Sequence, residues 1–380
     1  MRVPRILSFY VLREILLYTG VGLFVAGSIL VTQNLLRRLD DLETVGIGAT
    51  DFLTILACVL GMLSGYALPI AFLFGIMVAV GRISADSEYT AMRALGISFG
   101  QFAVAPLFLA LLACAATAVL LAEGDPLARR ELRALLAEIA SRGAVIEAGN
   151  FNRLDRQEQR LLFVEERDEQ NRLTGVLISD RSDPAQPFTV VAERGSYSFD
   201  REKATALLEL EKGDIHFEHE DAGKDEYRRI AFERFEYAVD MSALLGAGPS
   251  QIRPLEMTTR KILEVLDHFE SNQGRPPAEV RVKSKEQYEI QLHRRLALPL
   301  APLLFALVGV PLGLRRTHGA RSWGVLISAG LVFVYYLLLS LGSFLAESGA
   351  LPAWLALWMP NAAFAVVAVP LLYRARRAEI

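Results

Sequence analysis

Apolar and polar positions occur along the chain in long separate blocks. Six stretches without a charged residue are long enough to be membrane helices: residues 15–36, 52–81, 94–122, 296–314, 323–346 and 348–373. About 20 apolar residues in a helix cross the roughly 30 Å hydrocarbon core of a bilayer. We therefore expect six membrane helices in two groups of three. The second and third stretches exceed one span, so we expect interfacial turns in both.

The segment between the two groups, residues 123–295, is strongly polar and holds 27 of the 40 Lys and Arg residues and 34 of the 43 Asp and Glu residues. It opens with Leu and Ala at helical spacing over residues 126–142, which predicts an amphipathic extension of the third membrane helix. Strand patterns follow at residues 160–166, 173–179, 188–193, 204–211, 214–218 and 227–239. Helical patterns return at residues 258–271 and 279–295.

Several strands without intervening helices predict a β-sandwich or jellyroll. Turn signals at Glu193-Arg194-Gly195 and Lys212-Gly213-Asp214 separate neighbouring strand patterns. The expected fold class is an α-helical integral membrane protein with an inserted periplasmic β-jellyroll. We expect domain boundaries that give membrane helices at 1–122, the polar domain at 123–295 and membrane helices at 296–380.

Composition agrees with this division. Apolar residues make up 52% of the chain, mean hydropathy is +0.31, and charged residues still reach 22%. These values exclude a string of ordinary soluble domains. A net charge of −3 argues against a nucleic-acid partner, which needs a basic surface. The two cysteines, Cys58 and Cys114, lie in apolar runs, so we expect packing residues rather than a disulfide framework or metal ligands.

Basic residues mark one side of the predicted bundle. They gather in four segments that bound apolar stretches: Arg2, Arg5 and Arg13; Arg82 and Arg93; Arg315, Arg316 and Arg321; Arg374, Arg376 and Arg377. The positive-inside rule then places both termini in the cytoplasm and residues 123–295 in the periplasm of a bacterium with two membranes. The first apolar stretch is too long for a cleavable signal peptide and is expected to remain as an anchor.

The energy source for any transport lies outside the apolar stretches. None of the six contains an ionisable residue, which argues against an ion-coupled carrier. The chain has no G-x-x-x-x-G-K-[ST] phosphate loop, so we expect no ATP hydrolysis by this chain. It also shows no nucleophile elbow or other catalytic motif, which favours a non-catalytic protein.

One cluster could bind a metal. The run His216-Phe217-Glu218-His219-Glu220-Asp221 holds two histidines and three carboxylates, which suit a divalent cation. On a strand, however, residues three apart face opposite sides. A solvated strand end is the favoured interpretation, and we expect no metal site.

The segment between the second and third apolar stretches, residues 81–101, is too polar to span a membrane and too regular for a plain loop. Ser84 or Asp86 is expected to cap a short helix, and Gly96 to end it in the left-handed conformation. Three residues are expected to form its apolar side: Ala91, Met92 and Leu95. Such a helix at about 84–96 suits docking into the groove of a separate ATPase. An interfacial helix resting on lipid is the alternative.

The run LPIAFLFGIMVAVGRISADSEYTAMRALGIS at residues 68–98 resembles the signature of the LptF/LptG family of lipopolysaccharide-export permeases. Three helices, a periplasmic jellyroll and three more helices are that family's architecture. His293-Arg294-Arg295 followed by Leu-Ala-Leu-Pro, then Pro311-Leu312-Gly313, resembles the start of its fourth helix. The runs at residues 32–37 and 149–151 are more similar to the LptF half than to LptG.

The resemblance implies an ABC transporter permease subunit that extracts lipopolysaccharide from the inner membrane for delivery to the outer membrane. Its implied partners are an LptB-like ATPase dimer, an LptG-like paralogous permease and an LptC-like protein of the periplasmic bridge; no cofactor is implied. The family's coupling helix falls on Ser87, Glu88, Tyr89, Thr90, Met92, Arg93 and Gly96. Its acidic position matches Glu88, which is expected to meet the ATPase groove. The helices at 15–36 and 323–346 are implied to be lateral gates.

Head-group binding is implied for a second set of residues: Gln33, Asn34, Arg37, Arg38, Arg294 and Arg295. Arginine binds phosphate in a bidentate manner, and lipid A carries phosphates. Ordinary interfacial anchoring is the alternative for these arginines. The family often has a lysine where this chain has Asn34, so one head-group contact is expected to be missing or moved. A membrane scaffold or sensor, or a permease for another lipid, are the competing functions.

Overall fold

The computed structural model describes residues 5–43, 49–141, 148–153, 159–168, 170, 172–183, 186–200, 205–217, 220–221, 224–225, 228–240, 253–271, 285–314 and 320–377. The chain divides into two compact units. The helical unit comprises Met1–Thr32, Val59–Arg129 and Ile252–Ile380, and the sheet unit comprises Gln33–Cys58 and Arg130–Gln251. Each unit is described separately below.

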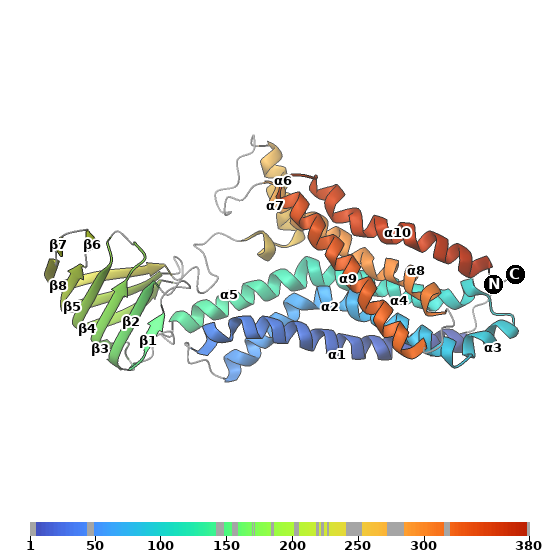
Figure 1. Ribbon diagram of the computed structural model, residues 1–380, viewed down its shortest axis with the longest axis horizontal. Coiled ribbons are helices and arrows are strands. Elements are labelled where there is room, and N and C mark those ends of the chain that lie inside the picture. Colours follow the sequence, from blue (N-terminus) through green and yellow to red (C-terminus); the bar gives the residue numbers. More distant parts are fainter. Residues whose placement is uncertain are drawn as a thin grey trace. The chain divides into compact units, whose positions relative to one another are not determined.

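Long helices dominate the described part of the chain (Figure 1). The first half contains α1 (Arg5–Glu43), α2 (Ala49–Ala85), α3 (Glu88–Ala94), α4 (Phe99–Val119), a π-helical turn (Leu120–Gly124) and α5 (Asp125–Ser141). The second half contains α6 (Thr259–Ser271), α7 (Lys285–Ala297), a 3₁₀ turn (Leu298–Leu300), α8 (Ala301–Gly313), α9 (Ala320–Glu347) and α10 (Ala353–Arg377). A further 3₁₀ turn covers Pro254–Glu256.

The described residues contain six helical segments long and apolar enough to cross a membrane, as predicted: Ile6–Ile29, Thr50–Ala85, Phe99–Leu136, Lys285–Gly313, Gly324–Glu347 and Ala353–Arg377. The first begins nine residues earlier than the charge-free stretch, so it includes Arg13 and Glu14. The turn expected within the third stretch is present, at residues 95–98 between α3 and α4. The turn expected within the second stretch is wrong, because α2 is continuous over these described residues.

At one end of the helical unit, a single apolar cluster joins helix ends that are distant in sequence. Tyr10 of α1, Tyr89 of α3, Leu314 after α8 and Leu372 of α10 pack against the same buried core. Ser84, buried in the last turn of α2, donates a hydrogen bond to the carbonyl of Leu314 over 3.0 Å. The described helix ends that border the four arginine-rich segments therefore share one cluster.

A second cluster surrounds Tyr335 of α9, whose ring lies 5.0 Å from that of Phe305 in α8. The Tyr335 hydroxyl donates to Asn361 Oδ1 over 2.9 Å, and Asn361 Nδ2 donates to the carbonyl of Ala297 over 2.8 Å. Ala297 ends α7, where the backbone tightens into the 3₁₀ turn and leaves this carbonyl available. A backbone acceptor inside a bilayer needs such an internal partner, because no water is present to supply one.

The sheet unit contains one six-stranded antiparallel sheet with the order β1-β2-β3-β4-β5-β8. Its strands are β1 (Phe151–Arg153), β2 (Arg160–Arg167), β3 (Arg172–Asp180), β4 (Phe188–Asp200), β5 (Thr205–Phe217) and β8 (Arg228–Asp240). The short strands β6 (Glu220–Asp221) and β7 (Lys224–Asp225) form a separate pair. The predicted β-domain is confirmed, and its described strands follow one another as a meander.

Two predicted turns are wrong, since both lie inside strands. Gly195 pairs with Leu210 in the middle of β4, and Gly213 pairs with Phe232 in the middle of β5. A Cβ added to Gly213 would overlap the carbonyl of Val191 and lie 2.6 Å from the Phe232 ring. Glycine is present here because the neighbouring strands β4 and β8 approach closely, which is a common reason for glycine within a strand.

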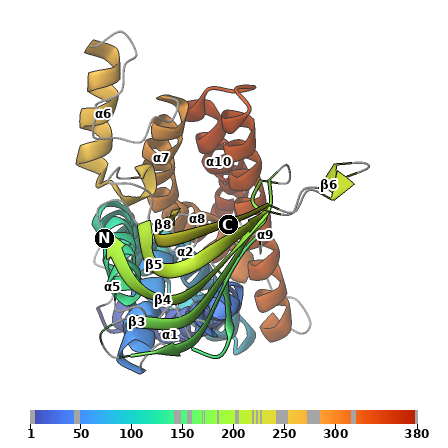
Figure 2. The ribbon, with the colours of Figure 1, turned by 90° about the vertical axis from the view of Figure 1, so that its left-hand side faces the viewer.

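The sheet curves around its own apolar core, as the bent strands in Figure 2 show. Buried side chains from five strands line the inner face: Leu162, Ile178, Val190, Leu208 and Val239. The Tyr237 hydroxyl of β8 donates to Asp180 Oδ2 of β3 over 2.7 Å, although β4 and β5 lie between these strands in the sheet. This hydrogen bond closes the curved sheet across its core.

Asp180 is the acceptor that holds this closure. Burial raises the pKa of its carboxyl, but hydrogen bonds from Ser182 and Tyr237 and the charge of Arg160 outweigh burial, so the pKa lies below its usual value. The Ser182 hydroxyl donates over 2.6 Å, and Arg160 Nε lies 3.2 Å from Oδ2. Because the folded-state pKa is lowered, this stabilisation is present at neutral pH and is lost as pH falls through the folded-state value.

We predict that Asp180→Asn destabilises the sheet by about 1–2 kcal/mol at neutral pH, because charge-assisted hydrogen bonds are replaced by weaker ones. The wild-type protein should keep this difference above the unfolded-state pKa of about 3.9 and lose it progressively as pH falls below that value towards the lower folded-state pKa. Thermal loss of the amide I β-sheet band in the purified full-length protein measures the effect. Glu193→Gln, an exposed carboxylate on β4, is the matched control. Equal midpoints for the Asp180→Asn and wild-type proteins at pH 7 would contradict the prediction.

Candidate functional site

The short helix α3 lies between the second and third membrane-capable segments and is shorter than predicted. Ser87 precedes it in the left-handed conformation, with φ 61°, which turns the chain out of α2. Both predicted caps are wrong: Ser84 is buried within α2, and the residue at the cap position of α3 is Ser87 rather than Asp86, whose carboxylate lies 3.4 Å from Arg82. Gly96 has φ 83°, so the predicted left-handed end is confirmed. A capping box between Ser98 and Gln101 then starts α4.

The apolar residues of α3 divide between two sides, which the sequence pattern did not predict. Met92 and Tyr89 pack into the core of the helical unit, and the Tyr89 ring lies 5.1 Å from that of Phe102. Leu95, directly after the helix, is 83% exposed. The outward face consists of the exposed residues Thr90, Ala91, Arg93, Ala94 and Leu95, which we call the α3 outer face. An exposed leucine at the end of an amphipathic helix is a side chain that can enter an apolar groove of a partner.

Glu88 opens α3, and its carboxylate contacts two other helices of the same unit. The Tyr10 hydroxyl of α1 donates to Glu88 Oε2 over 2.7 Å. Arg82 of α2 lies 3.9 Å from Glu88 Oε1 and also forms ion pairs with Glu14 at 2.8 Å and Asp86 at 3.4 Å. The Glu88 side chain is 31% exposed. The predicted contact of Glu88 with an ATPase groove stays a prediction, and its described partners are intramolecular.

The head-group residues predicted on α1 are only partly described. Gln33, Asn34, Arg37 and Arg38 lie within the helical backbone of α1, and their side chains lie outside the described part. Arg294 of α7 is described: its Nη2 donates to the Ser343 hydroxyl over 2.9 Å. With other polar residues it lines a pocket of about 630 Å³, whose further polar members are Arg253, Gln287, Gln291 and Glu347.

Arg295 takes a different position from its neighbour. It is 7% exposed, and its guanidinium donates to the carbonyls of Met257 over 2.6 Å and Leu255 over 3.2 Å. It thereby fastens the turn before α6 to the start of the fourth membrane-capable segment. Successive residues on a helix point about 100° apart, so adjacent arginines seldom face the same ligand. This spacing is the signal in the sequence that could have separated Arg295 from Arg294.

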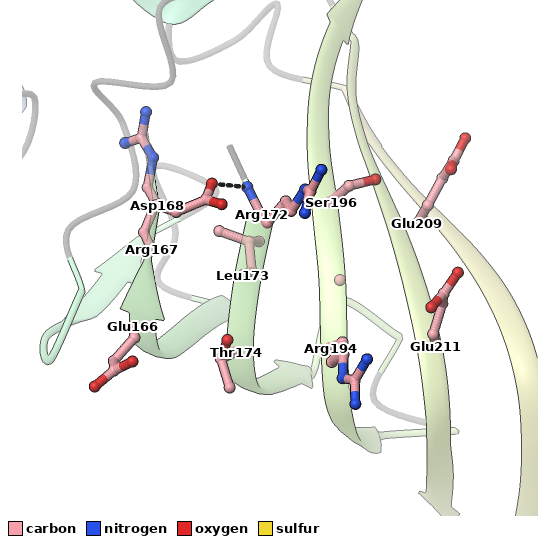
Figure 3. Close-up of a pocket in the computed structure, with 11 residues that line it drawn as sticks. Glu166, Arg167, Asp168, Arg172, Leu173, Thr174, Arg194, Ser196, Glu209 and Glu211 are labelled. Atoms are coloured by element: carbon pink, nitrogen blue, oxygen red, sulfur yellow. Dashed lines mark hydrogen bonds between the residues drawn. The ribbon is translucent and has the colours of Figure 1, made fainter. Parts of the chain in front are cut away.

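A charged pocket of about 500 Å³ lies on the sheet (Figure 3). Strand register brings Glu166, Thr174, Arg194 and Glu211 into one row across four strands. The lining includes both signs of charge: Arg167, Arg172 and Arg194 beside Glu166, Asp168, Glu209 and Glu211. Opposite charges on neighbouring strands stabilise a sheet face, and this balance gives no preference for an anion or a cation. The pocket therefore has the character of a solvated sheet surface.

Of the proposed metal-binding run, the structure describes the side chain of His216 on β5. Glu218 and His219 lie outside the described residues, and the side chains of Glu220 and Asp221 are not described. Among the described residues there is no group of three or more His, Cys, Asp or Glu side chains arranged to hold a metal ion. The two cysteines are free thiols in helices, Cys58 buried and Cys114 half-buried, in agreement with the packing role predicted for both.

These features define a class. Six membrane-capable helices in two groups of three, an antiparallel β-unit inserted between the groups, and a short helix with an exposed outer face are those of a multi-pass membrane permease. The sequence matches the family model described as "Lipopolysaccharide export system permease LptF/LptG" over residues 9–374. The chain belongs to this family, as the resemblance predicted.

Relatives with curated names agree with this assignment. The chain is 24% identical over 365 residues to the lipopolysaccharide export system permease protein LptF of Escherichia coli (strain K12), an alignment that covers 95% of this chain and 93% of the relative. The protein of the same name from Shigella flexneri gives the same identity and coverage. Both relatives carry the name LptF, the half of the family that the sequence resembled.

We predict that Arg295→Met destabilises the protein by about 1–3 kcal/mol, because the carbonyls of Leu255 and Met257 lose a charged donor in a buried site. Thermal unfolding of the detergent-purified protein, followed by tryptophan fluorescence, measures this effect. Arg294→Met is the matched control, since the same change on the adjacent residue removes one hydrogen bond to Ser343. A midpoint for Arg295→Met equal to that of wild type, or a larger loss in Arg294→Met, would show that Arg295 has no fastening role.

Proposed function

We propose that this chain is an LptF-type permease subunit of an ABC transporter that extracts lipopolysaccharide from the inner membrane for delivery to the outer membrane. The observation that carries the proposal is the α3 outer face, exposed between the second and third membrane-capable segments in a chain of the LptF/LptG family. The sequence has no phosphate loop. ATP is therefore hydrolysed by a separate LptB-like ATPase dimer, which docks on α3.

The proposed topology has both termini in the cytoplasm and residues 123–295 in the periplasm. The packing of helix ends supports it: the start of α1, α3, the end of α8 and the end of α10 meet in one cluster. Arginines gather in these same segments, and basic residues are retained on the cytoplasmic side. On this topology α3 faces the compartment where ATP and the ATPase are found. The periplasmic sheet passes lipid to an LptC-like protein of the bridge.

Pairing with an LptG-like paralogue is the second part of the proposal. Only 22% of the apolar window is buried in the first and in the fifth membrane-capable segment, against 61% in the second. Large apolar side chains of α1 and α9 face outward, among them Phe24, Phe333 and Phe344. Such outward apolar faces could be covered by lipid alone, as in any membrane protein. The family resemblance favours instead a paralogous subunit at α1 and α9, with lateral gates at these two helices. Lipopolysaccharide then enters a cavity that both subunits enclose.

Head-group phosphates are bound by residues near the periplasmic ends of the helices. The proposed contacts are Gln33, Asn34, Arg37, Arg38 and Arg294, whereas Arg295 supports the fold. Arg294 fits this role because it lines a polar pocket together with Arg253. Guanidinium groups match phosphate geometry with two parallel hydrogen bonds, and partial exclusion of water strengthens them.

We predict that affinity purification of the tagged chain from membranes recovers a cytosolic ABC ATPase and a second six-helix permease. Leu95→Asp should reduce ATPase recovery by at least about tenfold and retain the permease, because burying an unpaired carboxylate in an interface costs several kcal/mol. Leu263→Asp, at a half-exposed leucine on α6, is the matched control. Recovery of no ATPase by the wild-type chain would favour the scaffold function, and full recovery by Leu95→Asp would exclude the α3 outer face as the docking site.

We also predict that lipopolysaccharide is found by mass spectrometry among the lipids that co-purify with the complex. The double variant Arg37→Gln, Arg38→Gln should carry at least about a hundredfold less, because each hydrogen bond to a charged group contributes about 1.5–3 kcal/mol and two such contacts are lost. Arg260→Gln, on a side chain that is 90% exposed on α6, is the control. A wild-type complex that carries phospholipid without lipopolysaccharide would indicate a permease for another lipid.

A further inference from the structure

We propose that Tyr10 and Arg82 are positioning residues that fasten the start of α3 to α1, so that a displacement of α3 moves the first membrane helix with it. This inference rests on the proposed function for the identity of the docked partner, since the ATPase is what displaces α3. The fastening itself is a property of this chain and is argued from its contacts. We call Tyr10, Glu14, Arg82 and Glu88 the α1–α3 clamp.

Arg82 connects α2 to α1 through two contacts. Its Nε lies 2.8 Å from Glu14 Oε1, and its Nη2 donates to the Tyr10 hydroxyl over 2.5 Å. Tyr10 and Glu14 are four residues apart and therefore share one face of α1. The side chains of Arg82 and Glu14 are 23% and 17% exposed, so water competes weakly for these charges. The two charges are close and partly enclosed, but the Nε–H is not aligned for a hydrogen bond, so the attraction is electrostatic and the Tyr10 contact is the hydrogen bond of the two.

The Tyr10 hydroxyl extends this connection to α3. It accepts the hydrogen bond from Arg82 and donates one to Glu88 Oε2 over 2.7 Å. The direct distance between Arg82 Nη1 and Glu88 Oε1 is 3.9 Å, which is at the limit of an ion pair. The hydroxyl is therefore the closest link between Arg82 and Glu88. Because Glu88 is the first residue of α3, the link holds the helix at its beginning.

This link matters because α1 and α3 are distant in the chain. Tyr10 and Glu88 are separated by 78 positions, whereas α2 and α3 are joined directly through Asp86 and Ser87. The end of α2 is also attached to α8 through the hydrogen bond from Ser84 to the Leu314 carbonyl. A force on α3 therefore reaches α2 through the backbone and reaches α1 through the clamp. In the proposed transporter, α1 is a gate helix. The clamp therefore connects the helix on which the ATPase docks directly to a helix that forms a gate.

The first test measures the clamp without an ATPase. The full-length chain, with Cys58→Ala and Cys114→Ala, receives spin labels at Ile6→Cys and Ala94→Cys, two exposed positions on α1 and α3. Pulsed electron resonance in lipid nanodiscs should give one narrow distance distribution. Tyr10→Phe retains the ring and removes the bridging hydroxyl, so the distribution should broaden or acquire a second distance. Tyr18→Phe makes the same change two turns along α1 and should leave the distribution unchanged.

The second test uses the complex of the unlabelled chain with its co-purified ATPase, because a label at Ala94 would lie on the α3 outer face. Lipopolysaccharide released per ATP hydrolysed should fall at least about fivefold, because Tyr10→Phe removes both hydrogen bonds of the hydroxyl and each contributes about 1 kcal/mol. Recovery of the ATPase should be retained, because the α3 outer face is intact. Adding Tyr10→Phe to Glu88→Gln should cause little further loss, since both changes break the same link.

Equal label distributions in Tyr10→Phe and wild type would overturn the clamp, as would a Tyr18→Phe change as large as that of Tyr10→Phe. Release per ATP equal to wild type in the Tyr10→Phe complex would overturn its role in transmission. Absence of an ATPase from the wild-type preparation is a separate outcome. It would contradict the proposed function, and the label distances in the isolated chain would still decide whether the clamp exists.

Discussion

The helical unit depends on one constraint: inside a bilayer, every backbone donor and acceptor needs a partner within the protein. Two side chains donate to backbone carbonyls close to departures from regular α-helix. Pro69 of α2 cannot donate to the Gly65 carbonyl, and the Tyr336 hydroxyl of α9 donates to the carbonyl of the next residue, Tyr66, over 2.8 Å. Asn361 of α10 donates to the Ala297 carbonyl, where α7 passes into the 3₁₀ turn. The irregular helices of the bundle are thereby tied to their neighbours at the points where they deviate.

Charged side chains at the end of the bundle also have partners within the protein. Arg82 and Glu14 are part of membrane-capable segments, and each is paired with the other. The α3 outer face, by contrast, consists of small residues, one arginine and the exposed Leu95. The side of α3 that packs on the core and the side that is exposed are therefore formed by different residues of one short helix. This division supports a surface that can bind a partner while the opposite side stays attached to the membrane helices.

Sequence patterns predicted the six membrane helices, the β-unit and the family, because long apolar blocks and a long signature motif need no tertiary information. They failed where three-dimensional neighbours decide. The run around Gly213 has the residues of a turn, but Gly213 lies within β5. Glycine is needed there because Phe232 and Val191 approach it closely. Leu95 has the spacing of a core residue and is exposed, while Met92 is packed. Arg295 looks equivalent to Arg294, and only the turn at Leu255 and Met257 distinguishes them.

The π-helical turn at Leu120–Gly124 has a consequence for comparing members of this family. A π-helical turn accommodates one extra residue within an otherwise regular α-helix, without changing which faces are presented on either side. A relative that lacks one residue here can therefore present the same buried faces of α4 and α5 to its neighbours. Single-residue gaps in alignments of the third membrane helix belong at this turn, and placing them elsewhere would shift the face that carries buried Asp125 and Leu132 by about 100°.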